Sequence, residues 1–141
     1  MASSNGSVNR ILVVEDEPAI SQVCRRVLGR EGFEVDSAIN GEVAQDMLRK
    51  KGYDLILVDI RTPVMNGKEF YRHIKEEYSK LVDKVIFTTG DVIGGKTKSF
   101  LEQSGRPCLL KPFTPNELKA IVRETLRQIK NDGQKGERSS C

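Results

Sequence analysis

The sequence of 141 residues contains no tryptophan, one histidine and only three cysteines. Cys24, Cys108 and Cys141 form no Cys-x-x-Cys pair, which argues against a zinc site and against a disulfide framework. No apolar run approaches the roughly 18 residues that a membrane span needs, and the polar N-terminus lacks the apolar core of a signal peptide. A net charge of +3 is too small to indicate nucleic-acid binding. We therefore expect a cytoplasmic protein that contacts neither membrane nor nucleic acid directly.

The composition is that of a globular domain, with 38% hydrophobic and 30% charged residues. A chain of this length suits one domain with a proper hydrophobic core. Residues 1–9 and 131–141 show no hydrophobic periodicity, and we expect both ends to be disordered. The ordered domain is therefore predicted to span residues 10–130.

Short apolar runs alternate with amphipathic stretches along this domain. Five runs are predicted to be β-strands, at residues 10–14, 33–38, 54–58, 84–89 and 108–110. The last helix should begin after Thr114, because Thr114 and Glu117 match a capping box with Pro115 at the first helical position. Five strand–helix units predict an α/β fold, in which helices cover both faces of a parallel sheet.

Polar residues of a particular kind stand where these strands end. In open parallel sheets, ligands bind beyond the carboxyl ends of the strands. The residues there are Glu15, Asp16, Asp59, Thr88, Thr89 and Lys111. Three neighbouring carboxylates repel one another and need a cation, and an all-oxygen ligand set favours a hard ion such as Mg²⁺. A carboxylate beside such an ion can attack a phosphoryl group, whose charge lysine and threonine can stabilise. These positions predict phosphorylation of an aspartate.

Four segments, in this order, resemble the receiver domain of two-component response regulators, the family that includes the chemotaxis regulator. They are "ILVVEDE", "DLILVDIRTPVMNGKEF", "FTTGD" and "LLKPF". The match runs from about residue 10 to residue 129. The resemblance implies a flavodoxin-like, doubly wound parallel sheet of five strands in the order 2-1-3-4-5. It also implies a signalling domain of a phosphorelay, not an enzyme, that accepts a phosphoryl group from a histidine kinase or a histidine phosphotransfer domain.

The resemblance assigns a role to each residue at the strand ends. Asp59 would be the phosphoacceptor, while Thr89 and Lys111 would bind the phosphoryl group. Thr89 is preferred to Thr88, because Asp59, Thr89 and Lys111 then keep the spacing of the family. The Lys111–Pro112 peptide bond is expected to be cis, as in the family.

The resemblance also implies a metal site. Asp16 and Asp59 would bind Mg²⁺ or Mn²⁺ directly, together with the backbone carbonyl of Arg61. Glu15 would act largely through water. The metal ligands predicted from the family are therefore drawn from two strand ends and one loop.

The sequence departs from the family at the position three residues before the lysine. The family usually has tyrosine or phenylalanine there, and this ring swings inward on activation, whereas this chain has Cys108. A thiol cannot make the same switch, so we expect the loop and helix after the fourth strand to move instead. Gly90 would leave room beside the phosphoryl group. Arg61 and Asp91 flank the site, and their opposite charges predict an ion pair that hinders the hydrolytic water.

Two other functions are open alternatives. The segment "GDVIGGKT", from Gly90 to Thr97, matches the phosphate-loop pattern of nucleotide-binding proteins. In this chain the acidic strand precedes the loop, whereas in phosphate-loop proteins it usually follows. This alternative also leaves Glu15, Asp16 and Lys111 without a role. The second alternative is a pseudo-receiver, an interaction module of the same fold without phosphorylation.

The output partner is not indicated by the sequence. The segments "FTTGD" and "LLKPF" also resemble the receivers of hybrid sensor histidine kinases. We therefore expect either a single-domain regulator or the receiver of such a kinase.

Overall fold

Five strands form one parallel sheet in the structure, a computed structural model that describes residues 9–62, 64–90 and 95–135, without the side chains of 132–135. They are β1 (Arg10–Val14), β2 (Glu34–Ala38), β3 (Leu55–Asp59), β4 (Val85–Thr89) and β5 (Cys108–Leu110). Their order is β2-β1-β3-β4-β5, and every neighbouring pair is parallel. The predicted fold and strand order are confirmed.

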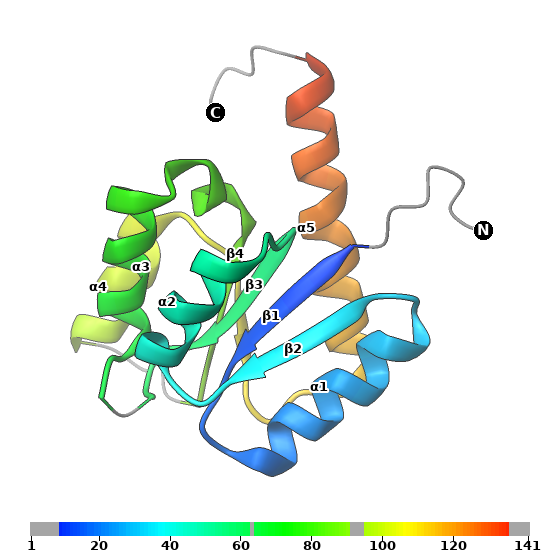
Figure 1. Cartoon of the computed structure of the whole chain (residues 1–141), viewed down its shortest axis with the longest axis horizontal. Helices are drawn as coiled ribbons and strands as arrows, with labels where there is room; N and C mark the ends of the chain where they lie inside the picture. The colour runs from blue at the N-terminus through cyan, green and yellow to red at the C-terminus, as the bar shows by residue number, and fades with distance from the viewer. Residues whose placement is uncertain (1–8, 63, 91–94, 136–141) are drawn as a thin grey trace.

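Helices cover both faces of the sheet (Figure 1). One layer contains α2 (Gly41–Lys50), α3 (Gly67–Glu77) and α4 (Gly95–Ser104), and the other contains α1 (Pro18–Arg30) and α5 (Pro115–Lys135). A short 3-10 helix, η1 (Ser79–Lys84), leads into β4. Two hydrophobic clusters fill the two faces of the sheet, because consecutive strand residues point to opposite sides. The central strands are apolar on both faces, which explains their continuous apolar sequences.

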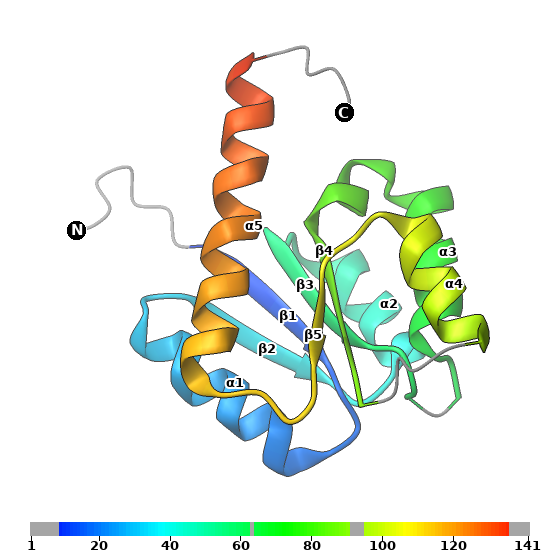
Figure 2. The ribbon, with the colours of Figure 1, turned by 180° about the vertical axis from the view of Figure 1, so that it is seen from behind.

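The last helix begins as predicted and extends further than predicted. The Thr114 N–H donates to Glu117 Oε1 at 2.8 Å, and the Glu117 N–H donates to Thr114 Oγ1 at 3.1 Å, which is the expected capping box. However, α5 continues to Lys135, whereas we expected the ordered domain to end at residue 130. Figure 2 shows its second half extending past the amino ends of the strands. The remaining ends, residues 1–8 and 136–141, lie outside the described residues.

The end of β3 is held in position by a close contact between the backbones of β3 and α3. The Gly67 N–H donates to the carbonyl oxygen of Ile60 at 2.9 Å. A Cβ atom at position 67 would lie 2.7 Å from Ile60 Cα and 2.8 Å from the carbonyl oxygen of Asp59. Only glycine fits such a contact without a backbone shift. The start of α3, capped by Asn66 and Glu69, is thereby held against the last residue of β3.

Candidate functional site

Lys111 lies between two buried carboxylates at the carboxyl end of the sheet. Its Nζ atom is 2.8 Å from Asp59 Oδ2 and 2.9 Å from Glu15 Oε1. The side chain of Lys111 is 15% exposed, that of Glu15 3% and that of Asp59 8%. These residues follow or end three different strands, and the parallel sheet brings their carboxyl ends together. The predicted convergence of Glu15, Asp59 and Lys111 is therefore observed.

Both oxygens of the Asp59 carboxylate accept hydrogen bonds. Oδ1 accepts the backbone N–H of Arg61 at 3.0 Å, and Oδ2 accepts the ammonium of Lys111 at 2.8 Å. The two bonds fix the orientation of the carboxylate at the end of β3. Arg61 contacts Asp59 through its N–H, and the role of its carbonyl as a metal ligand stays a prediction.

The environment shifts the pKa values of Glu15 and Lys111 upwards. Burial raises the pKa of Glu15, and the nearby charge of Asp59 adds to this effect, against the hydrogen bond from Lys111. Burial alone would lower the pKa of Lys111, but its hydrogen bonds to Asp59 and Glu15 outweigh this and raise it. Lys111 therefore remains an ammonium at neutral pH and compensates the charge of the carboxylates.

The acidic residues are close enough to share one metal ion. Glu15, Asp16 and Asp59 each offer a carboxylate oxygen, and these atoms lie within 4.8 Å of one another. Asp16 is exposed while Glu15 and Asp59 are buried, so the set is open to solvent at Asp16. An all-oxygen set with this much negative charge fits Mg²⁺ or Mn²⁺. The donor set is thus compatible with the predicted metal.

Two buried threonines end β4 beside this cluster. Asp59 is the register partner of Thr88, and the Lys111 N–H donates to the carbonyl oxygen of Thr89 at 2.9 Å. Strand alternation places the two side chains on opposite faces of the sheet, with Thr89 on the same face as Phe87. The assignment of Thr89 as the phosphoryl-binding hydroxyl stays a prediction.

The segment around Lys111 also matches an expectation from the family. The Lys111–Pro112 peptide bond is cis. A Cβ atom at Gly90 would have Lys111 Cβ as its nearest neighbour, at 3.9 Å, so position 90 has room for a small side chain. Asp91 lies outside the described residues, and its ion pair with Arg61 stays a prediction.

Cys108 packs against the hydrophobic cluster on the face of the sheet that α2, α3 and α4 cover. It is half-buried and is the register partner of Phe87. Burial raises the pKa of its thiol to about 11, so the side chain is neutral at pH 7. Phe87 forms edge-to-face contacts with Tyr71 of α3 and Phe100 of α4, with ring centroids 5.3 and 5.2 Å apart. Tyr71 also contacts Phe100, with ring centroids 5.9 Å apart, so the aromatic contacts of α4 come from β4 and α3, not from β5.

Sequence reasoning missed one residue of the site and the cavity beside it. Glu17 Oε1 is 3.8 Å from Lys111 Nζ, and the Glu17 N–H donates to Glu15 Oε2 at 3.1 Å. Glu17 directly follows the acidic pair Glu15–Asp16, which is the signal that could have identified it. A largely apolar cavity of about 360 Å³ adjoins this position, lined by Glu17, Ile20, Val23, Lys111, Pro112 and Phe113.

The phosphate-loop segment is only partly described. Gly95, with φ of +66°, is the first residue of α4, and Lys96 and Thr97 follow within the helix. Residues 91–94 lie outside the described residues. None of the helices in the described part of the chain has the length and apolarity that crossing a bilayer requires.

Comparisons with known proteins point to one family. The family model described as "Response regulator receiver domain" matches residues 11–123. The transcriptional regulatory protein ResD of Bacillus subtilis (strain 168) is 34% identical over 119 residues, which cover 84% of this chain and 48% of ResD. This chain therefore spans about half the length of the curated relatives that it matches.

Solved structures of the same family superpose on most of the chain. A CheY-like response regulator receiver domain protein from Methanospirillum hungatei JF-1 has 27% identity and a TM-score of 0.81, covering 89% of this chain and 99% of that one. The response regulator TrrA from Thermotoga maritima, solved in complex with Mg(2+)-BeF, has 32% identity and a TM-score of 0.71. Its match covers 84% of this chain and 99% of TrrA.

Proposed function

This chain belongs to the family of response regulator receiver domains of two-component signalling, and we propose that its Asp59 accepts the phosphoryl group. The observation that carries the proposal is the buried cluster in which Lys111 contacts both Asp59 and Glu15. Neither alternative, a phosphate-loop protein or a pseudo-receiver, has support from the comparisons.

The proposed reaction transfers a phosphoryl group from a phosphohistidine to the carboxylate of Asp59. A carboxylate oxygen of Asp59 attacks the phosphorus atom, a P–O bond forms, and the P–N bond to the imidazole breaks. The electron pair of the broken bond stays on the imidazole nitrogen, which takes up a proton from solvent. The phosphate donor is a histidine kinase or a histidine phosphotransfer domain, and this chain is the acceptor, not an enzyme acting on other substrates.

The residues around Asp59 stabilise the transferred charge. The ammonium of Lys111, 2.8 Å from Asp59 Oδ2, lies next to the position of a phosphoryl group on Asp59 and would neutralise its charge. Glu15 accepts a second bond from the same ammonium and holds it in place. The Thr89 hydroxyl would donate a hydrogen bond to the phosphoryl group, by analogy with the family.

A divalent ion is part of the proposal. Asp16 and Asp59, with the Arg61 carbonyl and with Glu15 through water, would hold Mg²⁺ or Mn²⁺. When bound, the ion reduces the repulsion between the carboxylates and the incoming phosphoryl group. The Mg(2+)-BeF complex of the related TrrA supports this assignment.

The cavity beside Lys111 offers a surface for the phosphate donor. Its apolar wall comes from Ile20 and Val23 of α1 and from Phe113. A donor that packs there would bring its phosphohistidine to the open side of the Asp59 cluster. The output partner or domain would then detect a movement of the loop and helix that follow β4.

Incubation with acetyl phosphate and Mg²⁺, followed by intact-mass spectrometry, tests this function. We expect a mass gain of one phosphoryl group that EDTA prevents and that Asp59→Asn abolishes. Asp83→Asn is the matched control, because Asp83 is exposed in η1 at the other end of the sheet, and it should keep the full gain. A folded protein that gains no mass, or an Asp59→Asn variant that still gains it, would contradict the proposal.

A binding assay separates this function from the phosphate-loop alternative. We expect no tight binding of Mg-ATP by the wild-type chain. Tight binding that is lost in Lys96→Ala would instead favour a nucleotide-binding protein.

A further inference from the structure

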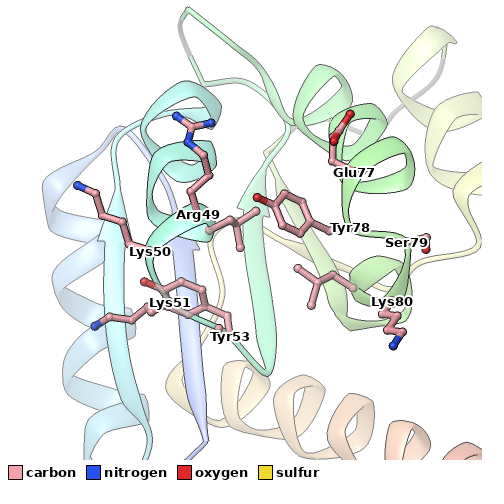
Figure 3. Close-up of a pocket in the computed structure, with 11 residues that line it drawn as sticks. Arg49, Lys50, Lys51, Tyr53, Glu77, Tyr78, Ser79 and Lys80 are labelled. Atoms are coloured by element: carbon pink, nitrogen blue, oxygen red, sulfur yellow. The ribbon is translucent and has the colours of Figure 1, made fainter.

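A cleft at the amino end of the sheet gathers positive charge that the phosphorylation site does not use (Figure 3). It lies between the C-terminal ends of α2 and α3, with η1 forming part of its wall, and it has a volume of about 570 Å³. The segments that line it lead into the first residues of β3 and β4. It therefore lies at the opposite end of the sheet from Asp59, which is the last residue of β3.

The floor of the cleft is apolar and held in place. It is formed by Leu48, Tyr53, Tyr78 and Leu81. Leu48 and Tyr53 are buried, and the hydroxyl of Tyr53 donates to Asp36 Oδ2 at 2.7 Å, which fixes the ring. Figure 3 shows the ring of Tyr78 extending from the end of α3 towards α2. Tyrosine and leucine side chains in a concave site provide the apolar contact that anchors a binding partner.

The rim of the cleft is basic. It is formed by Arg49, Lys50, Lys51 and Lys80, with Glu77 as the single carboxylate among the lining residues. Lys51 pairs with Asp36 at 3.3 Å, and Arg49 pairs with Asp46. In the part of the chain that the structure describes, Lys50 and Lys80 have no ion-pair partner. Both are exposed, and Figure 3 shows them on opposite sides of the cleft.

The positive charge comes from two separate elements. A favourable interaction with the helix dipole accounts for basic residues in the last turn of α2, where Lys50 lies. It does not account for Lys80, which belongs to η1 on the other side of the cleft. The two unpaired ammonium groups thus flank one apolar floor, an arrangement that requires the tertiary fold.

We propose that this cleft binds an acidic segment of a partner protein. An apolar side chain of the segment packs on Tyr78 and the floor, and flanking carboxylates lie against Lys50 and Lys80. Charge complementarity selects an acidic partner, and the apolar floor favours a polypeptide over a nucleic acid, whose backbone would gain little from it. Because Asp59 lies at the other end of the sheet, this binding does not require phosphorylation.

A peptide titration followed by NMR tests the proposal. The probe is a synthetic helical peptide with leucine on one face and glutamate on the other, added to the ¹⁵N-labelled chain. We expect the backbone amide signals of residues 48–53 and 77–81 to shift in saturable fashion, with or without phosphorylation of Asp59. A peptide with glutamine in place of every glutamate should bind about tenfold more weakly, because the charge attraction is lost.

A double variant tests the two lysines, with a control that changes the net charge equally. Lys50→Glu with Lys80→Glu should weaken binding of the acidic peptide about tenfold or more. The control is Lys98→Glu with Lys130→Glu, both exposed residues of α4 and α5, and it should change binding less than about twofold. An equal loss of peptide affinity in the two variants would show that only the net charge of the chain matters, and would overturn the proposal.

Other occupants of the cleft are outcomes of the same experiments. Signals that shift only outside residues 48–53 and 77–81, or equal binding of the glutamine peptide, would contradict the proposal. Sedimentation that shows a dimer broken by the cleft variant would assign the surface to self-association. Binding to phosphatidylglycerol vesicles but not to the peptide would assign it to a membrane.

Discussion

At the carboxyl ends of the strands, the ammonium of Lys111 lies between the buried carboxylates of Glu15 and Asp59, and little of it reaches solvent. At the amino ends, Lys50 and Lys80 are exposed to solvent on the two sides of the apolar floor of the cleft. The two ends of one sheet therefore use the same side chain differently. The first end holds its charges together inside the protein, and the second presents them outward.

Burial explains the difference between the two ends. Two opposite unit charges about 4 Å apart attract by about 1 kcal/mol in bulk water and by about 4 kcal/mol at the effective dielectric constant of about 20 that also describes buried sites in proteins. The pair of Lys111 with Asp59 lies towards the second case, and the pair of Lys51 with Asp36, whose side chains are 43% and 34% exposed, lies towards the first. The charges at the carboxyl end are thus held in one arrangement, whereas the charges at the amino end remain accessible from solvent.

The largest expected effect is the removal of the buried ammonium. Lys111→Met should lower the free energy of unfolding by about 3 kcal/mol at pH 7, because Glu15 and Asp59 stay buried without a counter-charge. Urea unfolding in a buffer without divalent cations measures it. Lys51→Met removes an exposed pair at the other end and should cost less than about 0.5 kcal/mol. Similar losses in both variants would show that burial does not distinguish the two ends.

A smaller effect is expected from the close approach of β3 and α3. Gly67→Ala should cost about 2 kcal/mol, because the new Cβ would lie 2.7 Å from Ile60 Cα and force the backbone to shift. It should also lower the yield of phosphorylation, since Asp59 belongs to the displaced backbone. Gly52→Ala, beside the cleft, meets nothing within 4 Å and should change stability by less than about 0.5 kcal/mol. Equal unfolding curves for both variants would contradict the close contact.

The smallest expected effect concerns the hydroxyl of Tyr53 at the amino end. Its hydrogen bond is the main cause that lowers the pKa of Asp36. Tyr53→Phe should cost about 1 kcal/mol at pH 7. A carboxyl group with a lowered pKa contributes stability above its unfolded pKa of about 3.9, and this contribution is lost as the pH falls through the folded pKa. The difference between wild type and variant should therefore shrink below about pH 4.

Urea unfolding at pH 7 and at lower pH checks this dependence, with Tyr78→Phe as the matched control. The hydroxyl of Tyr78 has no hydrogen-bond partner among the described residues, so its loss should cost less than about 0.3 kcal/mol at either pH. A loss in Tyr53→Phe that is independent of pH would show that Asp36 is not the group involved.

Much of the fold could be predicted because the signals are local. Apolar runs identified the strands to within one residue at each end, and the Thr114 capping box identified the start of α5. The end of α5 was predicted too early. Residues 131–135 have no apolar pattern that would mark them as helical, yet they continue a helix that has already formed.

Only the part of the candidate site that lies at the ends of the strands could be predicted from the sequence. Glu15, Asp59 and Lys111 were identified because parallel strands bring their carboxyl ends to one edge. The third carboxylate near Lys111, that of Glu17, was missed, because its approach depends on the turn between β1 and α1. Neither Lys50 nor Lys80 belongs to a motif, so nothing in the sequence indicates that the two lysines lie beside the same cleft.

The sequence by itself determined the alternation of strands and helices, the residues at the strand ends and the family. It did so because hydrophobic periodicity and capping act between residues that are near one another in the chain. Only the tertiary structure decided how deeply Lys111 is buried and which carboxylates it contacts. It also decided that α2 and η1 enclose one cleft. Burial and contact across the sheet are properties of packing between distant segments, and packing fixes how strongly each charge acts.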